Sequence, residues 1–454
     1  MSSLESQIKE YVKSLGAPIV GVAGPERFDG PASLDPGYIM RGAKSIVSFA
    51  MPMDLNAIYG FLSKKDQISH NLDQLKCNQW MANISVKTAK FIESLGYRSR
   101  AVHSNNHYRR SFDMFSTKPD FSHRFGAIVA GIGAHGLSGN ILTKEYGAAV
   151  YLGTVVTKAK LKSDPMLPPR YFFDNYCKKC QICDKACVSR MFVGDKEEYV
   201  LINGELHPRG KRRHVELCNA SCFGLHGLSA DKLWSSWGDH WIKKWVGVEP
   251  DPEKENIRRT LLVKGGNVGD SYERYNLIRH IGGEVYPMEW VQDKTKFNKT
   301  VKDFSDDELI RREETSEWLY NLIGVKTRNT NVLTCGQCAL VCGPTIQESA
   351  KRFKMLREGG IVVPGKDRRT MVVKTFEEAR TIREKYPIIV TPKEKSRDNT
   401  LSSLLWFRHY WGFSLRSYLK NKQYEKKFQK VIKEKEIDPA DDHIMEAVHA
   451  NTRI

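Results

Sequence analysis

Four closely spaced cysteines decide the class of this protein. They lie in the stretch Cys177-Lys178-Lys179-Cys180-Gln181-Ile182-Cys183-Asp184-Lys185-Ala186-Cys187. Gaps of two, two and three residues bring several sulfurs to one point, as metal ligation requires, whereas disulfide frameworks tie distant loops together. Zinc sites instead pair two CxxC units across a longer loop. The spacing therefore favours a 4Fe–4S cluster on Cys177, Cys180 and Cys183, with Cys187 directed to a second cluster.

A shorter copy of this pattern occurs near residue 340. It consists of Cys335, Cys338 and Cys342, and it lacks one upstream ligand, which Cys218 or Cys222 can supply. In two-cluster ferredoxins the last cysteine of each motif ligates the other cluster. This exchange predicts two ligand sets, one of Cys177, Cys180, Cys183 and Cys342, the other of Cys187, Cys335, Cys338 and one of Cys218 or Cys222. The polar lead-in 214–217 favours Cys218, and both remain open.

The remaining cysteine and the composition add further expectations. Cys77 stands alone and is expected to be a buried hydrophobic residue. The chain has 454 residues, of which 41% are hydrophobic and 27% are charged, as in globular rather than disordered proteins. It contains no apolar run of about 18 residues, so no membrane-spanning helix is expected. The N-terminal sequence MSSLESQIKEYVKSLG lacks a signal-peptide pattern, which predicts a cytoplasmic location.

The net charge of +18 admits nucleic acid, an anionic membrane or an acidic protein as partner. Several basic residues lie beside the cysteine motifs: Lys178, Lys179, Arg209, Lys211, Arg212 and Arg213. We expect them to form a basic rim. Such a rim suits a small acidic electron donor, a ferredoxin or flavodoxin, better than nucleic acid.

The N-terminal third of the chain has the alternating pattern of an α/β unit. Apolar spacing predicts helices over 3–15 and 85–95 and strands over 18–22, 45–51 and 149–157. The apolar stretch 126–136 is expected to be a buried strand or loop beside its glycines. The pattern predicts four regions: a cofactor domain at 1–165, a cluster domain at 166–225 and 330–350, an aromatic-rich insert at 226–329, and a basic C-terminal extension at 351–454.

Two aromatic segments have open interpretations. Trp234, Trp237, Trp241 and Trp245 are spaced to share one face of a helix, which either packs in the protein or lines a substrate site. The basic, aromatic stretch 391–436 predicts a terminal helix that packs on its own domain. Peripheral contact with an anionic membrane, or docking on a partner, is the alternative.

The segment AGIGAHGLSGNILTKEYG at 130–147 resembles a glycine-rich block of corrinoid-dependent reductive dehalogenases and epoxyqueuosine reductases, which are double-cluster 4Fe–4S reductases. Val155, Val156, Thr157, Leu161, Asp164 and Pro165 then precede the cysteine motif in the order typical of that superfamily. The resemblance covers about 1–225 and 330–345. It implies an α+β fold, in which a nitroreductase-like α/β domain joins a ferredoxin-like two-cluster domain with a large insert, and a cobalamin bound base-off between them.

The resemblance also implies roles for individual residues. The cofactor-binding candidates are Gly131, Gly133, Gly136, Ser138, Gly139, Asn140, Tyr146 and Gly147, whose glycines allow close backbone approach. Counting back from the block places the residue that positions the substrate at Lys118. The acid/base tyrosine of the family falls near Trp80, where no tyrosine occurs, so the proton donor is sought among Tyr97, Tyr108, His103, His107 and Tyr146.

These features together predict a cobalamin-dependent iron–sulfur reductase of an organohalide or another small reducible substrate. Electrons would pass through the two 4Fe–4S clusters. The alternative is an electron-transfer or redox-activating protein that has two clusters and no substrate of its own. Modification of tRNA is a third hypothesis, against which stand the divergent site region and the absence of a clear general-acid aspartate near Thr117 and Lys118.

Overall fold

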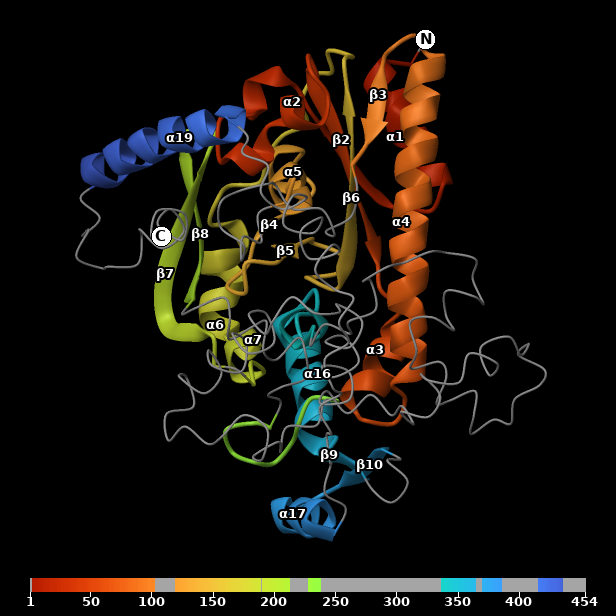
Figure 1. The fold of residues 1–454 in the computed structure, drawn as a ribbon, viewed down its shortest axis with the longest axis vertical. Coiled ribbons are helices and arrows are strands. Elements are labelled where there is room, and N and C mark those ends of the chain that lie inside the picture. Colours follow the sequence, from red (N-terminus) through yellow and green to blue (C-terminus); the bar gives the residue numbers. More distant parts are fainter. Residues whose placement is uncertain are drawn as a thin grey trace, which may run out of the picture.

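The computed structural model describes residues 2–102, 119–188, 190–212, 228–237, 336–364, 370–385 and 415–435. Helices and strands are mixed throughout these ranges, in agreement with the expected α+β class (Figure 1). Within the same ranges, no helix is both long enough and apolar enough to cross a membrane.

A four-stranded antiparallel sheet forms the centre of the N-terminal part (Figure 1). Its strand order is β1 (Ile19–Ala23), β2 (Ser45–Pro52), β6 (Val150–Thr157) and β3 (Ser99–Ala101). The two middle strands pair along their whole length, from Ser45 opposite Thr157 to Pro52 opposite Val150. Almost every residue of β2 is buried, as expected for a strand that is covered on both faces. The predicted strands at 18–22, 45–51 and 149–157 are therefore confirmed.

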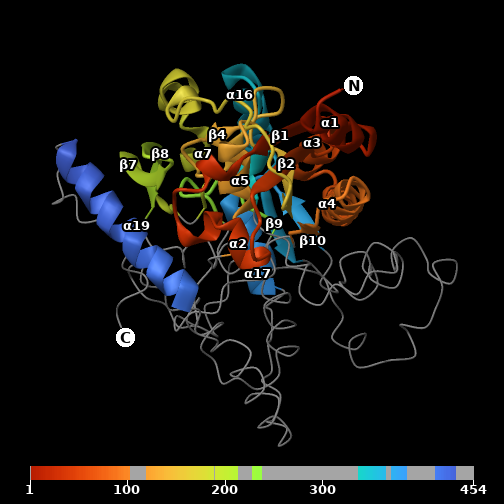
Figure 2. The same ribbon diagram turned by 90° about the horizontal axis from the view of Figure 1, so that it is seen from above.

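Helices cover both faces of this sheet (Figure 2). On one face lie α1 (Leu4–Ser14) and α4 (Ile68–Ser94), whose buried residues share a core with Phe49 and Val155. On the other face lies α5 (His123–Val129), which packs on Ile46 and Val156. The helix predicted at 3–15 is confirmed, and the one predicted at 85–95 is the last part of α4. Cys77 is buried in the first core, as expected.

Two local predictions are wrong over part of their length. Residues 126–129 belong to helix α5, which the Ser122 side chain caps by accepting a hydrogen bond from the Phe125 amide, whereas 130–136 form the expected buried loop and strand. Short apolar runs fit a buried helix and a buried strand equally well. The Trp234 region is not helical: residues 228–237 form a turn closed by a bridge between Leu228 and Ser235. Trp241 and Trp245 lie outside the described residues.

The turn around Trp234 is held by an aspartate. The Asp231 carboxylate accepts hydrogen bonds from the Ser229 hydroxyl at 2.6 Å and from the Leu233 amide at 3.2 Å, which favours a turn over a helix. Trp234 is buried, and the Trp237 indole donates to the Phe61 carbonyl at 2.9 Å. Trp234 and Trp237 therefore pack in the protein, Trp234 within a buried cluster and Trp237 against it, in agreement with the first of the two interpretations.

The remaining elements lie beside and below the sheet in Figure 1. They are the short helices η1 (Pro25–Arg27), η2 (Ala32–Leu34), α2 (Pro36–Ile39) and α3 (Leu55–Leu62), the strand pair β4 (Ala134–His135) and β5 (Ile141–Leu142), the hairpin β7 (Phe192–Ile202) and β8 (Glu205–Arg212), α16 (Ile346–Glu358), the strand pair β9 (Ile361–Pro364) and β10 (Thr370–Val373), and α17 (Phe376–Lys385).

The described part of the basic, aromatic stretch 391–436 is a helix, α19 (Leu415–Glu434), that packs on its own chain (Figure 1). Phe428 and Ile432 are buried against the β7–β8 hairpin, and the Tyr424 hydroxyl accepts a hydrogen bond from the Leu201 amide at 3.0 Å. Lys427 forms an ion pair with Asp29 at 2.9 Å. The prediction of a packed terminal helix is therefore confirmed for residues 415–434, and membrane contact stays a prediction.

The α4 face that covers the sheet is expected to carry much of the stability of this part. Ile92 is fully buried, so Ile92→Ala should lower the free energy of unfolding by about 2–5 kcal/mol through lost burial and a cavity. Val86 lies on the same helix and is 46% exposed, so Val86→Ala should change the free energy of unfolding by less than about 0.5 kcal/mol. Urea denaturation followed by circular dichroism measures both. Equal effects would contradict this packing.

Candidate iron–sulfur site

The first cysteine motif lies on a tightly wound segment below the β7–β8 hairpin (Figure 1). Cys177 ends a π-helical turn, η3 (Phe173–Cys177), and Cys180 ends the next turn, α6 (Lys178–Cys180). Gln181 then adopts a left-handed conformation with φ of 48° and begins α7 (Ile182–Lys185), which carries Cys183. The left-handed conformation of Gln181 separates α6 from α7 and keeps the three cysteines in one short, compact segment.

The second motif repeats this backbone pattern. Gly336 has φ of 60° and begins α15 (Gln337–Leu340), which carries Cys338, just as Gln181 begins α7. The two short helices contact each other. The left-handed residue is a glycine in one copy, where that conformation is unstrained, and a glutamine in the other. The two cysteine motifs are therefore structural repeats packed side by side.

Four sulfurs from the two motifs share one neighbourhood. Burial and, to a smaller extent, the nearby Cys180 sulfur raise the pKa of Cys177 to about 12. Burial also raises the pKa of Cys183 and Cys342. The Cys342, Cys177, Cys338 and Cys180 thiols add to the rise at Cys183, and the Cys177, Cys180 and Cys338 thiols add to it at Cys342. Cys177, Cys180, Cys183 and Cys342 are the ligand set that the exchange rule predicts for one cluster.

The chemistry of these donors fits an iron–sulfur cluster. Buried thiols that disfavour each other's ionisation need cations to become thiolates, and cluster irons supply them. Among the described residues, no group of three or more His, Cys, Asp or Glu side chains is close enough to hold a single metal ion. A cluster instead binds each thiolate on a different iron. The Leu137 amide donates to the Cys177 sulfur at 3.4 Å, a contact typical of cluster ligands.

The second ligand set is described only in part. Cys335, Cys218 and Cys222 lie outside the described residues, so their grouping with Cys187 and Cys338 stays a prediction. The sulfurs of the two described members each accept a hydrogen bond. The Met191 amide donates to the Cys187 sulfur at 3.4 Å, and the Asn140 side-chain amide donates to the Cys338 sulfur, also at 3.4 Å.

Tyr176 joins the two motifs beside the first ligand set. Its hydroxyl lies within hydrogen-bond distance of the Gly343 carbonyl at 2.9 Å, the Thr345 carbonyl at 2.8 Å and the Ser349 hydroxyl at 2.6 Å. Ser349 is fully buried and accepts a hydrogen bond from the Gly343 amide at 2.9 Å. Burial and the nearby Cys342 thiol raise the pKa of Tyr176. The sequence analysis missed Tyr176, although its position directly before Cys177 is a signal that could have identified it.

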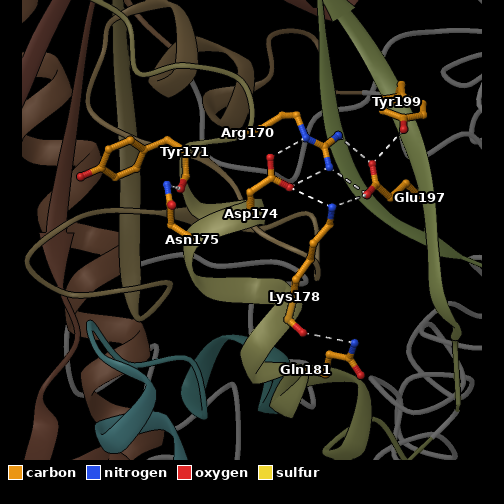
Figure 3. Close-up of polar contacts among 8 residues, drawn as sticks. All are labelled: Arg170, Tyr171, Asp174, Asn175, Lys178, Gln181, Glu197 and Tyr199. Atoms are coloured by element: carbon orange, nitrogen blue, oxygen red, sulfur yellow. Dashed lines mark hydrogen bonds and ion pairs between the residues drawn. The ribbon is translucent and has the colours of Figure 1, made fainter.

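An ion-pair network holds the first motif against the hairpin (Figure 3). The Arg170 guanidinium bonds to the carboxylates of Asp174 and Glu197, both at 2.8 Å, and Lys178 reaches Asp174 at 3.0 Å. The hydrogen bond from Arg170 lowers the pKa of Asp174 to about 2. Both carboxylates are therefore anionic near neutral pH, and the network links η3 and α6 to β7.

The predicted basic rim is only partly on the surface. Lys178 and Lys179 are exposed, and Arg213 lies outside the described residues. Lys211 is only 4% exposed. Arg209 and Arg212 are partly buried and form ion pairs with Glu198, which is buried. On β8 the rim prediction is therefore wrong for Lys211 and holds only in part for the two arginines, whose charge is paired with Glu198.

The glycine-rich block packs on the chain itself. A side chain at Gly131, which has φ of 73°, would meet the Pro165 carbonyl. One at Gly147, which has φ of 63°, would meet the Gly343 carbonyl beside Cys342. Gly133 and Gly136 contact Leu142 in the same way. The close approach that these glycines allow is used by neighbouring backbone, and binding of a cofactor by Ser138, Gly139, Asn140 and Tyr146 stays a prediction.

Of the candidate catalytic residues, Tyr97 is not brought to the cysteines, whereas Tyr146 directly precedes Gly147, which packs against Cys342 and Gly343. Tyr97 follows the end of α4, is 40% exposed, and lies beside Ser99, which pairs with Thr157 at one end of β6. The cysteine motifs lie near the other end of that strand, where the Ala148 amide bonds to the Cys342 carbonyl at 3.1 Å. Lys118, Tyr108, His103 and His107 lie outside the described residues.

Comparisons with known proteins identify the relatives of this chain. Epoxyqueuosine reductase of Atelocyanobacterium thalassa (isolate ALOHA) is 35% identical over 75 residues, 16% of this chain and 24% of that protein. Tetrachloroethene reductive dehalogenase of Dehalobacter restrictus (strain DSM 9455 / PER-K23) is 25% identical over 158 residues, 35% of this chain and 25% of that protein. Both are reductases of the families that the glycine block and cysteines resemble. The superfamily resemblance is confirmed.

The match covers a limited part of these relatives. It spans about a quarter of the length of each curated protein. No family model matches the chain. Among solved structures, a reductive dehalogenase reported to suggest a mechanism for B12-dependent dehalogenation is 17% identical, with a TM-score of 0.37, over 60% of this chain and 35% of that chain.

Removing the Tyr176 hydroxyl tests its role in joining the motifs. Tyr176→Phe leaves the buried Ser349 hydroxyl short of a partner, which should lower the free energy of unfolding by about 1–3 kcal/mol. Tyr171→Phe, a few residues earlier, removes a hydroxyl that makes none of these bonds and should change it by less than about 0.5 kcal/mol. Urea denaturation of the metal-free variants measures the difference, and indistinguishable midpoints would count against this role.

Proposed function

We propose that this chain is a cobalamin-dependent iron–sulfur reductase of an organohalide or another small reducible substrate. The observation that supports it most strongly is the convergence of Cys342 on Cys177, Cys180 and Cys183. This ligand from a distant segment is the one that the two-cluster pattern requires. The relatives, both reductases, support the same class of reaction.

Different residues of the chain would carry the separate tasks of such an enzyme. Cys177, Cys180, Cys183 and Cys342 hold one 4Fe–4S cluster, and Cys187, Cys335 and Cys338 hold the second together with Cys218 or Cys222. The clusters supply one-electron carriers, and the cobalamin, when bound, supplies the metal that reacts with the substrate. The glycine block and Lys118 remain the candidates for cofactor and substrate binding.

The proposed architecture follows from these assignments. Residues 1–165 form the nitroreductase-like cofactor domain, and 166–225 with 330–350 form the ferredoxin-like domain. Lys178 and Lys179 are the exposed cations beside the first motif. We place the docking of a cytoplasmic ferredoxin or flavodoxin-type donor there, because opposite charge favours encounter with a small acidic protein.

A single ligand substitution tests the cluster assignment. Cys180→Ser removes one ligand of the first cluster, so anaerobically purified protein should lose about half of an expected eight irons per chain. The matched control is Cys77→Ser, because Cys77 is buried in the N-terminal core and belongs to neither motif. Iron and acid-labile sulfide analysis measures both variants. Full iron retention in Cys180→Ser would refute the ligand assignment.

Cobalt content distinguishes the reductase from the electron-transfer alternative. After anaerobic reconstitution with cobalamin, the reductase should retain about one cobalt alongside about eight irons per chain. Metal analysis after gel filtration, with the visible spectrum of the bound corrinoid, measures this. A chain that retains its iron and releases all cobalt is instead an electron-transfer protein without its own substrate.

A further inference from the structure

The side chain of Asn140 bridges a cysteine sulfur and an arginine. Its amide nitrogen donates to the Cys338 sulfur at 3.4 Å, and its amide oxygen accepts from the Arg124 guanidinium at 2.8 Å. Asn140 directly precedes β5, Arg124 lies on α5, and Cys338 comes from the second motif, 198 residues further along the chain. Both polar ends of one side chain are thus used in a single orientation.

The backbone around Asn140 is held in a tight turn. The Gly136 amide donates to the Asn140 carbonyl at 3.0 Å, and the Gly139 amide donates to the Gly136 carbonyl at 2.9 Å. The hairpin secures this turn from outside, because the Gly210 amide of β8 donates to the Leu137 carbonyl at 2.8 Å. Because the backbone of Asn140 is already fixed, its side chain loses little conformational entropy when it forms its hydrogen bonds.

The Arg124 contact fixes which way the amide points. A guanidinium can only donate, so it selects the amide oxygen and leaves the NH2 group facing the Cys338 sulfur. A cation on the oxygen also polarises the amide and strengthens the N–H donor at its other end. Arg124 therefore acts on the sulfur through Asn140.

Such a bond has an electrochemical consequence when Cys338 ligates a cluster. Reduction adds one electron to the cluster, so its ligand sulfurs become more negative while no bond breaks and no proton moves. A hydrogen bond to a ligand sulfur stabilises the reduced form more than the oxidised form, because bonds to more negative acceptors are stronger. Hydrogen bonds to sulfur are among the factors that set the potentials of 4Fe–4S clusters.

We propose that Asn140 is a positioning residue that raises the reduction potential of the second cluster, and that Arg124 enforces its orientation. This inference rests on the proposed ligation of a cluster by Cys187 and Cys338. It gives Asn140 a task different from the cofactor contact that the family resemblance implies. The second cluster is thereby made a better acceptor of the electron that the donor supplies.

The test is a redox titration of the full-length, anaerobically purified protein, followed by electron paramagnetic resonance of the reduced clusters. Asn140→Leu keeps the size of the side chain and removes the donor. At a fixed potential, the ratio of reduced to oxidised second cluster should fall about three- to tenfold. A tenfold fall corresponds to about 59 mV for a one-electron couple. The signal of the first cluster should not move, because Asn140 bonds to none of its ligands.

A charge variant and its control separate orientation from general electrostatics. Arg124→Gln should shift the second cluster in the same direction by a smaller factor. Arg100→Gln removes an equal charge from β3, where Arg100 donates to the Ile39 carbonyl at 3.2 Å, and should leave both clusters unchanged. An Asn140→Gln variant retains an amide donor on a longer arm and should recover part of the shift.

The outcomes are distinguishable by iron content, measured on every sample. Full iron with an unmoved second cluster in Asn140→Leu overturns the inference, as does an equal shift of both clusters. If Asn140→Leu loses iron, the Arg124→Gln titration decides, and an unshifted potential there overturns it. Absence of iron from the unaltered chain instead refutes the proposed function on which the inference rests.

Discussion

The burial of thiols from two distant segments in one place is the constraint on which the rest of this structure depends. Each buried sulfur of the set makes ionisation of its neighbours harder, as the raised pKa of Cys177 records. Such a group is favourable only with cations among the sulfurs and with polar hydrogens directed at them. The chain supplies hydrogens from the Leu137 amide and binds Cys342 into place through its backbone bond with Ala148.

The glycine-rich block at 130–147 has a structural task beside the cysteines, in addition to the cofactor contact proposed for it. Gly147 lets the backbone at Gly343 come close, and Gly136 leaves room for Leu142 near the Cys177 sulfur. A side chain at Gly147 would collide with the backbone carbonyls of Cys342 and Gly343, and one at Gly136 would collide with the Leu142 side chain. The block is thus the joint between the two proposed domains. A residue pattern that resembles a cofactor-binding element therefore also has a structural reason in this chain.

The basic character of the protein is divided between surface and interior. Lys178 and Lys179 are exposed, and Lys178 also pairs with Asp174. Arg209 and Arg212 neutralise Glu198 on the hairpin. Burial of Arg209 lowers its pKa to about 10, which still leaves it charged near neutral pH. The hairpin that carries these pairs also secures the turn around Asn140. The net charge of the sequence therefore overstates the positive charge on the surface that a docking partner would contact.

The sequence by itself determined the parts that depend on local spacing. Helix α1 and strands β2 and β6 follow from apolar periodicity, and the grouping of the first three cysteines follows from gaps too short for any other arrangement. The structure showed that residues 123–129 form a helix, that Trp234 lies in a turn, and that Lys211 of β8 is buried while its arginines pair with Glu198. It alone revealed the bonds of Tyr176 to Ser349 and of Asn140 to Cys338. Those contacts join residues more than a hundred positions apart, and local patterns carry no information about which distant segments chain packing brings together.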